Sequence, residues 1–103
     1  MPSYYYRYTG DAEKAYIDSQ RLIQSLSGLT YLTPDYYDSA GEAERLLAMP
    51  ARPIWRIGPI PGETLPEVDV SPRRVVPRFG KTGGGREIAV RGAIPYPEAA
   101  RLK

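Results

Sequence analysis

The stretch Tyr4-Tyr5-Tyr6-Arg7-Tyr8-Thr9-Gly10-Asp11 decides how the chain begins to fold, because a run of strand-forming residues ends there at a glycine and an acid. Tyrosine and threonine favour strands, so the pattern predicts a first strand over residues 4–9. Asp11 suits the cap of a helix, and apolar residues at helical spacing follow it as far as Leu26, before a stop at Ser27-Gly28. We therefore expect a strand that leads directly into a helix.

The same alternation repeats once further along the chain. Leu29-Thr30-Tyr31-Leu32-Thr33 predicts a second strand that ends at Pro34, since proline cannot continue a hydrogen-bonded ladder. Ser39 and Glu42 then have the spacing of a capping box for a second helix, which closes at Pro50. The first half of the chain therefore carries two short helices.

Prolines divide the second half of the chain, and they leave room only for strands of about five residues. The strand candidates are Ile54-Trp55-Arg56-Ile57, Arg74-Val75-Val76 and Glu87-Ile88-Ala89-Val90-Arg91. Residues 96–103 fit either a helical turn or a loose tail. Early helices and late strands predict one α+β domain over residues 1–103, built around a bent or split sheet that is rich in antiparallel pairs.

The chain has no cysteine and no histidine among its 103 residues, and this excludes several kinds of site. A thiolate nucleophile, a disulfide, an imidazole base and an ordinary zinc site all need the missing residues. No apolar run approaches the roughly 18 to 20 residues of a membrane span, and the start of the chain does not resemble a signal peptide. Catalysis must therefore use carboxylates, hydroxyls, arginine or lysine, or a bound cofactor.

The formal charge of +2 hides an asymmetry between the two halves of the chain. Residues 1–50 hold four bases and seven acids, whereas residues 51–103 hold ten bases and five acids. Most of the bases are arginines, whose planar fork suits phosphates and carboxylates. The second half is the one expected to bind anions, although a solvated basic face has the same composition.

Phe79-Gly80-Lys81-Thr82-Gly83-Gly84-Gly85-Arg86-Glu87 is the sharpest local feature of the sequence. Three consecutive glycines let backbone amides approach an anionic ligand closely, although a plain hairpin loop would also use them. Their spacing matches neither a P-loop nor a dinucleotide fingerprint. Glu87 opens the next predicted strand, where it is either a reactive carboxylate at the mouth of the loop or a strand-end charge paired with an arginine.

Arg7 and Thr33 are two further candidates for a site. Arg7 shares a strand face with Tyr5 and Thr9, and it either clamps a phosphate or stacks on a tyrosine at the surface. Thr33 lies at a strand end, where its hydroxyl either holds a ligand group or caps the turn into Asp35.

Three separated pieces of the chain, taken in order, resemble a known group of proteins. They are Tyr6-Arg7-Tyr8-Thr9-Gly10, then Thr30-Tyr31-Leu32-Thr33-Pro34 with the acidic helix that ends Leu46-Leu47-Ala48-Met49-Pro50, then Val76-Pro77-Arg78-Phe79-Gly80-Lys81-Thr82-Gly83-Gly84-Gly85-Arg86-Glu87. Together they are similar to the C-terminal toxin domains of bacterial polymorphic toxins of the Rhs, contact-dependent and type VI kinds. The nearest likeness is to the NAD-consuming ones, namely ADP-ribosyltransferase effectors and necrotizing-toxin NAD glycohydrolases.

The resemblance implies an ADP-ribosyltransferase-like fold that takes NAD as its substrate and uses no metal. It implies that Arg7 holds the NAD phosphates, that Thr33 braces the nicotinamide pocket and that Glu87 acts on the nicotinamide ribose as the catalytic carboxylate. The further NAD-binding residues that follow from it are Tyr8, Thr9, Tyr31, Phe79, Gly83, Gly84 and Gly85. The glycohydrolase toxins carry glutamine in place of Glu87, and this difference favours transfer over hydrolysis.

We therefore expect an antibacterial toxin domain that cleaves the nicotinamide–ribose bond of NAD and transfers ADP-ribose to a protein or RNA acceptor. The resemblance implies a cognate immunity protein, secretion as part of a larger toxin and delivery to the cytoplasm of a target bacterial cell, with no membrane partner. Three alternatives stay open: an NAD(P) glycohydrolase toxin, a metal-independent ribonuclease toxin and a non-enzymatic binding module.

Overall fold

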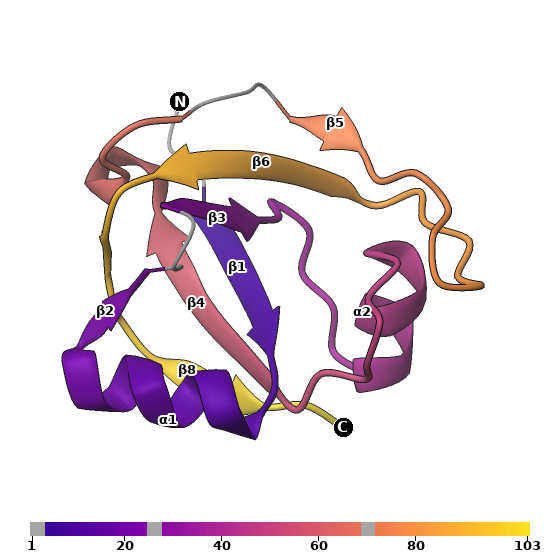
Figure 1. Cartoon of the computed structure of the whole chain (residues 1–103), viewed down its shortest axis with the longest axis horizontal. Coiled ribbons are helices and arrows are strands. Elements are labelled where there is room, and N and C mark those ends of the chain that lie inside the picture. The colour runs from indigo at the N-terminus through magenta and orange to yellow at the C-terminus, as the bar shows by residue number, and fades with distance from the viewer. Residues whose placement is uncertain (1–3, 25–27, 69–71) are drawn as a thin grey trace.

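A computed structural model of the chain describes residues 4–24, 28–68 and 72–103. Its helices are α1 (Asp11–Gln20) and α2 (Ala40–Leu46), and a short 3-10 turn covers Gly62–Thr64. The strands, in chain order, are β1 (Tyr4–Thr9), β2 (Leu22–Ile23), β3 (Leu29–Leu32), β4 (Trp55–Pro61), β5 (Arg73–Arg74), β6 (Arg86–Arg91), β7 (Ile94–Pro95) and β8 (Ala99–Arg101) (Figure 1).

The strands form two antiparallel three-stranded sheets, with the orders β1-β4-β8 and β3-β6-β5, and β2 pairs with β7. In Figure 1, β6 and β5 run across the top of the molecule while β1 and β4 run diagonally below them. The sheets meet where Tyr6 of β1 and Thr33, just beyond β3, exchange backbone hydrogen bonds of 2.8 and 2.9 Å. The predicted α+β class, with two early helices and antiparallel strands, is therefore confirmed.

The main core is aliphatic and brings together residues of α1 and of both sheets. Its fully or almost fully buried members are Ile17, Ile23, Leu32, Ile57, Ile60, Ile88, Val90 and Ile94. Burial of each such side chain contributes about 1.5 to 3 kcal/mol before the entropy of ordering the chain is subtracted. A second, smaller cluster contains Tyr8, Tyr37 and Ala43. Leu46, Leu47 and Met49 pack against this second cluster.

The first helix differs from its prediction at both ends. Gly10, and not Asp11, is the N-cap, and the Asp11 carboxylate instead accepts a hydrogen bond of 2.7 Å from the Trp55 indole. The helix ends at Gln20 because Arg21 takes a left-handed conformation with φ of 59°. The chain then turns into β2, which places Ile23 in the core as a strand residue. Leu26 and Ser27, expected at the end of this helix, lie outside the described residues.

Several other bounds also differ from the sequence prediction. Ser39 caps α2 by accepting the Glu42 amide at 3.1 Å, as predicted, but the helix ends at Leu46 rather than near Pro50. β4 continues through its prolines to Pro61, and β5 covers Arg73–Arg74 alone. Residues 99–101, left open between a turn and a tail, form β8 at the edge of β4.

Gly58 lies in β4 where the register between β1 and β4 shifts. Its φ is +133°, and a Cβ there would stand 2.7 Å from the Tyr5 carbonyl oxygen and 2.9 Å from the Tyr6 ring. Glycine is therefore required for the strand to pass this point.

We expect Gly58→Ala to lower the free energy of unfolding by about 2 to 4 kcal/mol, because it adds both backbone strain and a clash with main-chain atoms. Urea denaturation measures the loss. The matched control is Gly41→Ala in α2, where the nearest atom to a new Cβ is 3.5 Å away. This control should raise stability by about 0.5 to 1 kcal/mol through helix propensity. Equal stability of Gly58→Ala and the natural chain would contradict the prediction.

Candidate functional site

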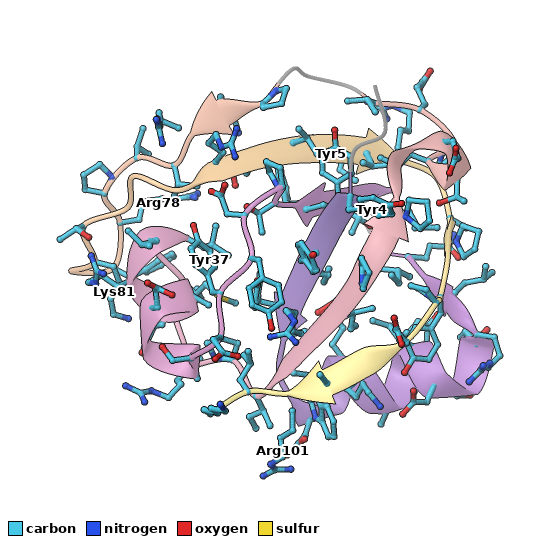
Figure 2. All side chains as sticks on the ribbon, turned by 180° about the vertical axis from the view of Figure 1, so that it is seen from behind. Tyr4, Tyr5, Tyr37, Arg78, Lys81 and Arg101 are labelled. Carbon is cyan, nitrogen blue, oxygen red and sulfur yellow. The ribbon has the colours of Figure 1, made fainter. Side chains whose placement is uncertain are left out.

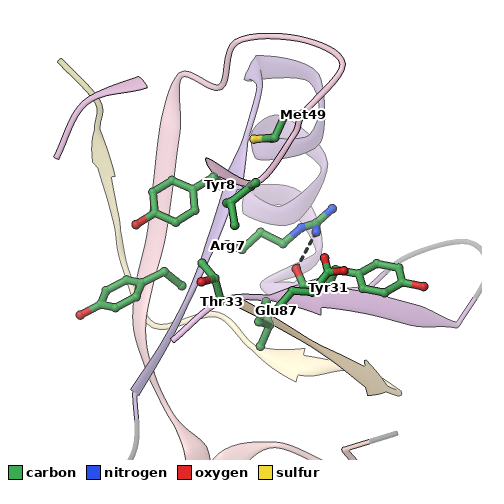
Figure 3. Close-up of a pocket in the computed structure, with 9 residues that line it drawn as sticks. Arg7, Tyr8, Tyr31, Thr33, Met49 and Glu87 are labelled. Atoms are coloured by element: carbon green, nitrogen blue, oxygen red, sulfur yellow. Dashed lines mark hydrogen bonds between the residues drawn. The ribbon is translucent and has the colours of Figure 1, made fainter. Parts of the chain in front are cut away.

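A pocket opens at the split between the two sheets, and we call it the inter-sheet pocket (Figure 3). Its lining comes from β1, from the end of β3, from the segment after α2 and from the start of β6. The residues are Tyr6, Arg7, Tyr8, Tyr31, Leu32, Thr33, Leu47, Met49 and Glu87. Five residues that the sequence singled out, far apart in the chain, therefore share one cavity: Arg7, Tyr8, Tyr31, Thr33 and Glu87.

A second hollow continues from the inter-sheet pocket and shares Tyr31, Leu47, Met49 and Glu87 with it. Its far side is lined by Arg73, Arg78 and Phe79. A third hollow adds Arg74 and Val76 beside the same two arginines and Glu87. We call these two hollows the arginine groove. Glu87 lines all three cavities and so stands where the pocket joins the groove.

Glu87 is largely buried, with 14% of its side chain exposed, and its Oε1 lies 3.3 Å from the Arg73 guanidinium. The pair follows from the strand register, because Arg73 of β5 lies opposite Glu87 of β6. Both interpretations of this glutamate therefore describe its surroundings: it is paired with an arginine and it lies in a cavity.

Arg7 lines the inter-sheet pocket, but its guanidinium is already engaged. Its Nε and NH2 donate to both carboxylate oxygens of Glu13 at 2.7 to 2.9 Å, and its NH1 donates to the Tyr31 carbonyl at 2.9 Å (Figure 3). Glu13 also accepts a hydrogen bond from the Thr9 hydroxyl. A carboxylate thus occupies the fork that was predicted to clamp a phosphate, and Arg7 instead connects β1, α1 and β3.

Glu13 is the residue of this cluster that the sequence prediction missed. It lies in the first turn of α1, and because that helix folds back directly after β1, its carboxylate reaches Arg7 and Thr9 of the strand. The signal in the sequence is an acid in the first helical turn after a strand that carries an arginine.

Thr33 and Tyr8 are both held by the turn around Asp35. Thr33 Oγ1 accepts the Asp35 amide at 3.0 Å, which is the turn-capping role foreseen as its structural alternative. The Tyr8 hydroxyl donates to the Asp35 carbonyl at 3.1 Å and accepts the Tyr37 amide at 2.6 Å, and burial raises its pKa above the usual value. Tyr8 is therefore a wall of the pocket. Tyr31, with 45% of its surface exposed, has a ring accessible to a ligand.

The Asp35 carboxylate also fixes the start of β6. It accepts hydrogen bonds from the Arg86 Nε, NH2 and amide nitrogen at 2.7 to 3.1 Å. Burial alone would raise the pKa of Asp35, but the hydrogen bonds from Arg86 outweigh it and hold that pKa below its usual range. Since Arg86 precedes Glu87, this clamp sets the position of Glu87 relative to Thr33.

The predicted anion cradle at the three glycines is wrong, because their amides point into the protein. The amides of Gly83, Gly84 and Gly85 donate to the carbonyls of Arg45, Val75 and Leu46 at 2.9 to 3.0 Å. A Cβ at residue 85 would stand 2.5 Å from the Tyr37 hydroxyl. The glycines therefore let the loop pack tightly against the end of α2, and they do not line the described cavities.

The tip of the same loop is a two-residue turn. Phe79 and Gly80 have φ of 54° and 72°, as a type I′ turn requires, and the Lys81 amide closes it by donating to the Arg78 carbonyl at 2.8 Å. The Lys81 ammonium anchors the turn by donating to Glu44 and to the Met49 carbonyl, each at 3.0 Å. Figure 2 shows Lys81 beside α2.

Within residues 4–24, 28–68 and 72–103, no group of three or more acidic residues is placed to hold a metal ion. Over the same residues, no helix has the length and apolar composition for crossing a membrane. No protein-family model, curated protein or solved structure matches this chain.

We expect Asp35→Asn to lower the free energy of unfolding by about 1 to 3 kcal/mol at pH 7, because it removes the charge that Arg86 surrounds. The folded pKa lies below the unfolded value of about 4, so this stabilisation is present above pH 4 and is lost as the pH falls through the folded value. The difference in the free energy of unfolding between Asp35→Asn and the natural chain should therefore decrease towards pH 2. Urea denaturation at a series of pH values from 2 to 7 measures this difference.

Asp38→Asn is the control, because its carboxylate is 64% exposed and its ion pairs are long, at 3.7 and 4.0 Å. It should change stability by less than about 0.5 kcal/mol at any pH in the series. A loss in Asp35→Asn that stayed constant from pH 7 to pH 2 would refute the role given to its charge.

Proposed function

We propose that this chain binds NAD with its nicotinamide end in the inter-sheet pocket, cleaves the bond between nicotinamide and ribose, and transfers ADP-ribose to an acceptor. The observation that carries the proposal is that Tyr31 and Thr33, at the end of β3, and Glu87, at the start of β6, line one cavity between two antiparallel sheets. The same arrangement supports the finer assignment of an ADP-ribosyltransferase-like fold.

The inter-sheet pocket has the chemistry that a flat cationic ring needs. Leu32, Leu47 and Met49 supply apolar walls, and the exposed face of Tyr31 favours a positively charged aromatic ring. The buried Thr33 hydroxyl accepts the Asp35 amide and has its own proton left to donate. The carboxamide oxygen of nicotinamide is a suitable acceptor for that proton.

Glu87 supplies the charge that the reaction needs. The bond between ribose C1′ and the ring nitrogen breaks, and its electron pair leaves with neutral nicotinamide. The positive charge passes to the ribose, as in the oxocarbenium-like transition state of glycoside hydrolysis. A fixed carboxylate at the mouth of an apolar pocket stabilises that charge as it develops. The acceptor nucleophile then bonds to C1′ and releases its proton to the carboxylate or to solvent.

The setting implied by the resemblance belongs to the same proposal. A toxin domain of this activity, delivered into the cytoplasm of a bacterial cell, would modify a protein or RNA of that cell. Its producer would need an immunity protein that blocks access to Glu87. Hydrolysis of NAD differs only in that water is the acceptor, so the products distinguish the two reactions.

We expect Glu87→Gln to lower the rate of ADP-ribose transfer from NAD by at least about 100-fold, because glutamine keeps the shape of the side chain and removes the charge. The assay follows free nicotinamide and the transfer of adenylate-labelled ADP-ribose in a bacterial lysate. Glu63→Gln, at an exposed position remote from the pocket, is the matched control and should keep full activity.

The label separates the possible outcomes. Labelled protein or RNA supports transfer. Release of nicotinamide together with free labelled ADP-ribose would instead indicate hydrolysis and would contradict transfer. Release of no nicotinamide by the natural chain would refute the whole proposal. Undiminished activity of Glu87→Gln would refute the catalytic role of this carboxylate.

Tyr31 provides a separate test of the pocket. Tyr31→Ala should raise the KM for NAD about tenfold through loss of ring stacking, whereas Tyr31→Phe should stay within about twofold. Tyr36→Ala removes a tyrosine of similar exposure that does not line the pocket, and it should leave KM unchanged. Steady-state kinetics of nicotinamide release measure all three variants, and an equal effect of Tyr31→Ala and Tyr36→Ala would exclude stacking on Tyr31.

A further inference from the structure

The phosphates of NAD need hydrogen-bond donors that are not already used. Arg7 donates to a bidentate carboxylate and to a carbonyl, and the amides of the three consecutive glycines donate to backbone carbonyls. A phosphate at either place would have to displace an interaction within the protein. The groups that the resemblance assigned to the phosphates are therefore occupied.

Arg73 and Arg78 have guanidinium donors that are not used within the described part of the protein. Arg78 is exposed, and among the described residues its guanidinium has no hydrogen-bond or ion-pair partner. The Arg73 side chain is 56% exposed, and its ion pair with Glu87 at 3.3 Å leaves most of its donors available. Both arginines line both hollows of the arginine groove. Figure 2 shows Arg78 at the edge of the molecule, away from Arg101.

The groove carries a surplus of positive charge on a fixed scaffold. Arg73, Arg74 and Arg78 face one carboxylate, Glu87, along its length. Arg74 holds the β5 segment against the glycine loop by donating to the Gly84 carbonyl at 2.9 Å. Guanidinium groups that converge on an open groove suit the bidentate binding of phosphate oxygens.

An aromatic ring lies beside these arginines. Phe79 is 63% exposed and lines the same hollow as Arg73 and Arg78. Its place is fixed by the type I′ turn and by the Lys81 contacts with Glu44 and Met49. An exposed aromatic ring beside cationic side chains is the kind of surface on which a nucleotide base stacks.

We propose that the arginine groove binds the adenosine diphosphate part of NAD, with Arg73 and Arg78 on the phosphates and Phe79 against the adenine. The proposed function identifies the whole ligand as NAD, and this inference rests on it for that point alone. The groove joins the inter-sheet pocket through Tyr31, Leu47, Met49 and Glu87. A dinucleotide with nicotinamide in the pocket therefore extends its diphosphate past Glu87 towards Arg73.

The test measures ADP binding by isothermal titration calorimetry with the natural chain and with Arg78→Gln, Arg73→Gln and Arg101→Gln. ADP carries no nicotinamide, so binding is measured apart from catalysis. We expect each of the first two variants to weaken ADP binding at least about tenfold, and NAD to compete with ADP. Arg101→Gln, which changes an exposed arginine of β8, should leave the affinity within about twofold.

Equal ADP affinity in Arg78→Gln and the natural chain would overturn the inference. So would a short single-stranded RNA that binds through Arg78 and is not displaced by NAD, because the groove would then belong to a polynucleotide. ADP binding that depends on Arg78, without nicotinamide release from NAD, would support the groove and refute the proposed reaction. Nicotinamide release with an unchanged KM in Arg78→Gln would uphold the reaction and reject the groove.

Discussion

The backbone bridge between Tyr6 and Thr33 is the contact on which the candidate site depends. It joins the two sheets at the point where the inter-sheet pocket opens, so residues of β1 and β3 face the same space. Arg7 strengthens the junction by donating to Glu13 on one side and to the Tyr31 carbonyl on the other. Because the peptide groups and the guanidinium are satisfied within the protein, the junction is a rigid frame for whatever the pocket holds.

The two sides of the site differ in polarity and charge, and Glu87 lies between them. On one side are apolar and aromatic walls, and on the other are guanidinium groups on β5 and the loop that follows it. The Asp35–Arg86 clamp holds the start of β6 and so keeps Glu87 between the two regions. A ligand that is a flat ring at one end and a diphosphate at the other matches this division, and it places its central sugar nearest to the carboxylate.

Local patterns in the sequence were enough to predict the elements whose ends are determined by neighbouring residues. The first strand, the Ser39 cap and the strand that carries Glu87 follow from propensity, capping chemistry and the glycines before it. The two-residue β2 was not predictable, because it depends on pairing with a strand some seventy residues later in the chain. Glu13 was missed for a related reason, since its partner lies on another element. Arg7 lines the same pocket as Thr33 and Glu87, but its ion pair could not be predicted without knowing that Glu13 faces it.

The glycine triplet shows how a sequence pattern acquires a different meaning once the backbone is known. The amides of Gly83 and Gly85 donate to carbonyls at the end of α2, and that of Gly84 donates to the Val75 carbonyl. The missing side chains of Gly83 and Gly85 leave room for main-chain carbonyls and the Tyr37 hydroxyl. In this chain the triplet therefore attaches one loop to one helix, and the side chains that face the cavities are those of Arg73, Arg78 and Glu87. The part of the sequence that looks most like a ligand-binding motif is thus a packing device, and the residues on either side of it meet the solvent-filled space.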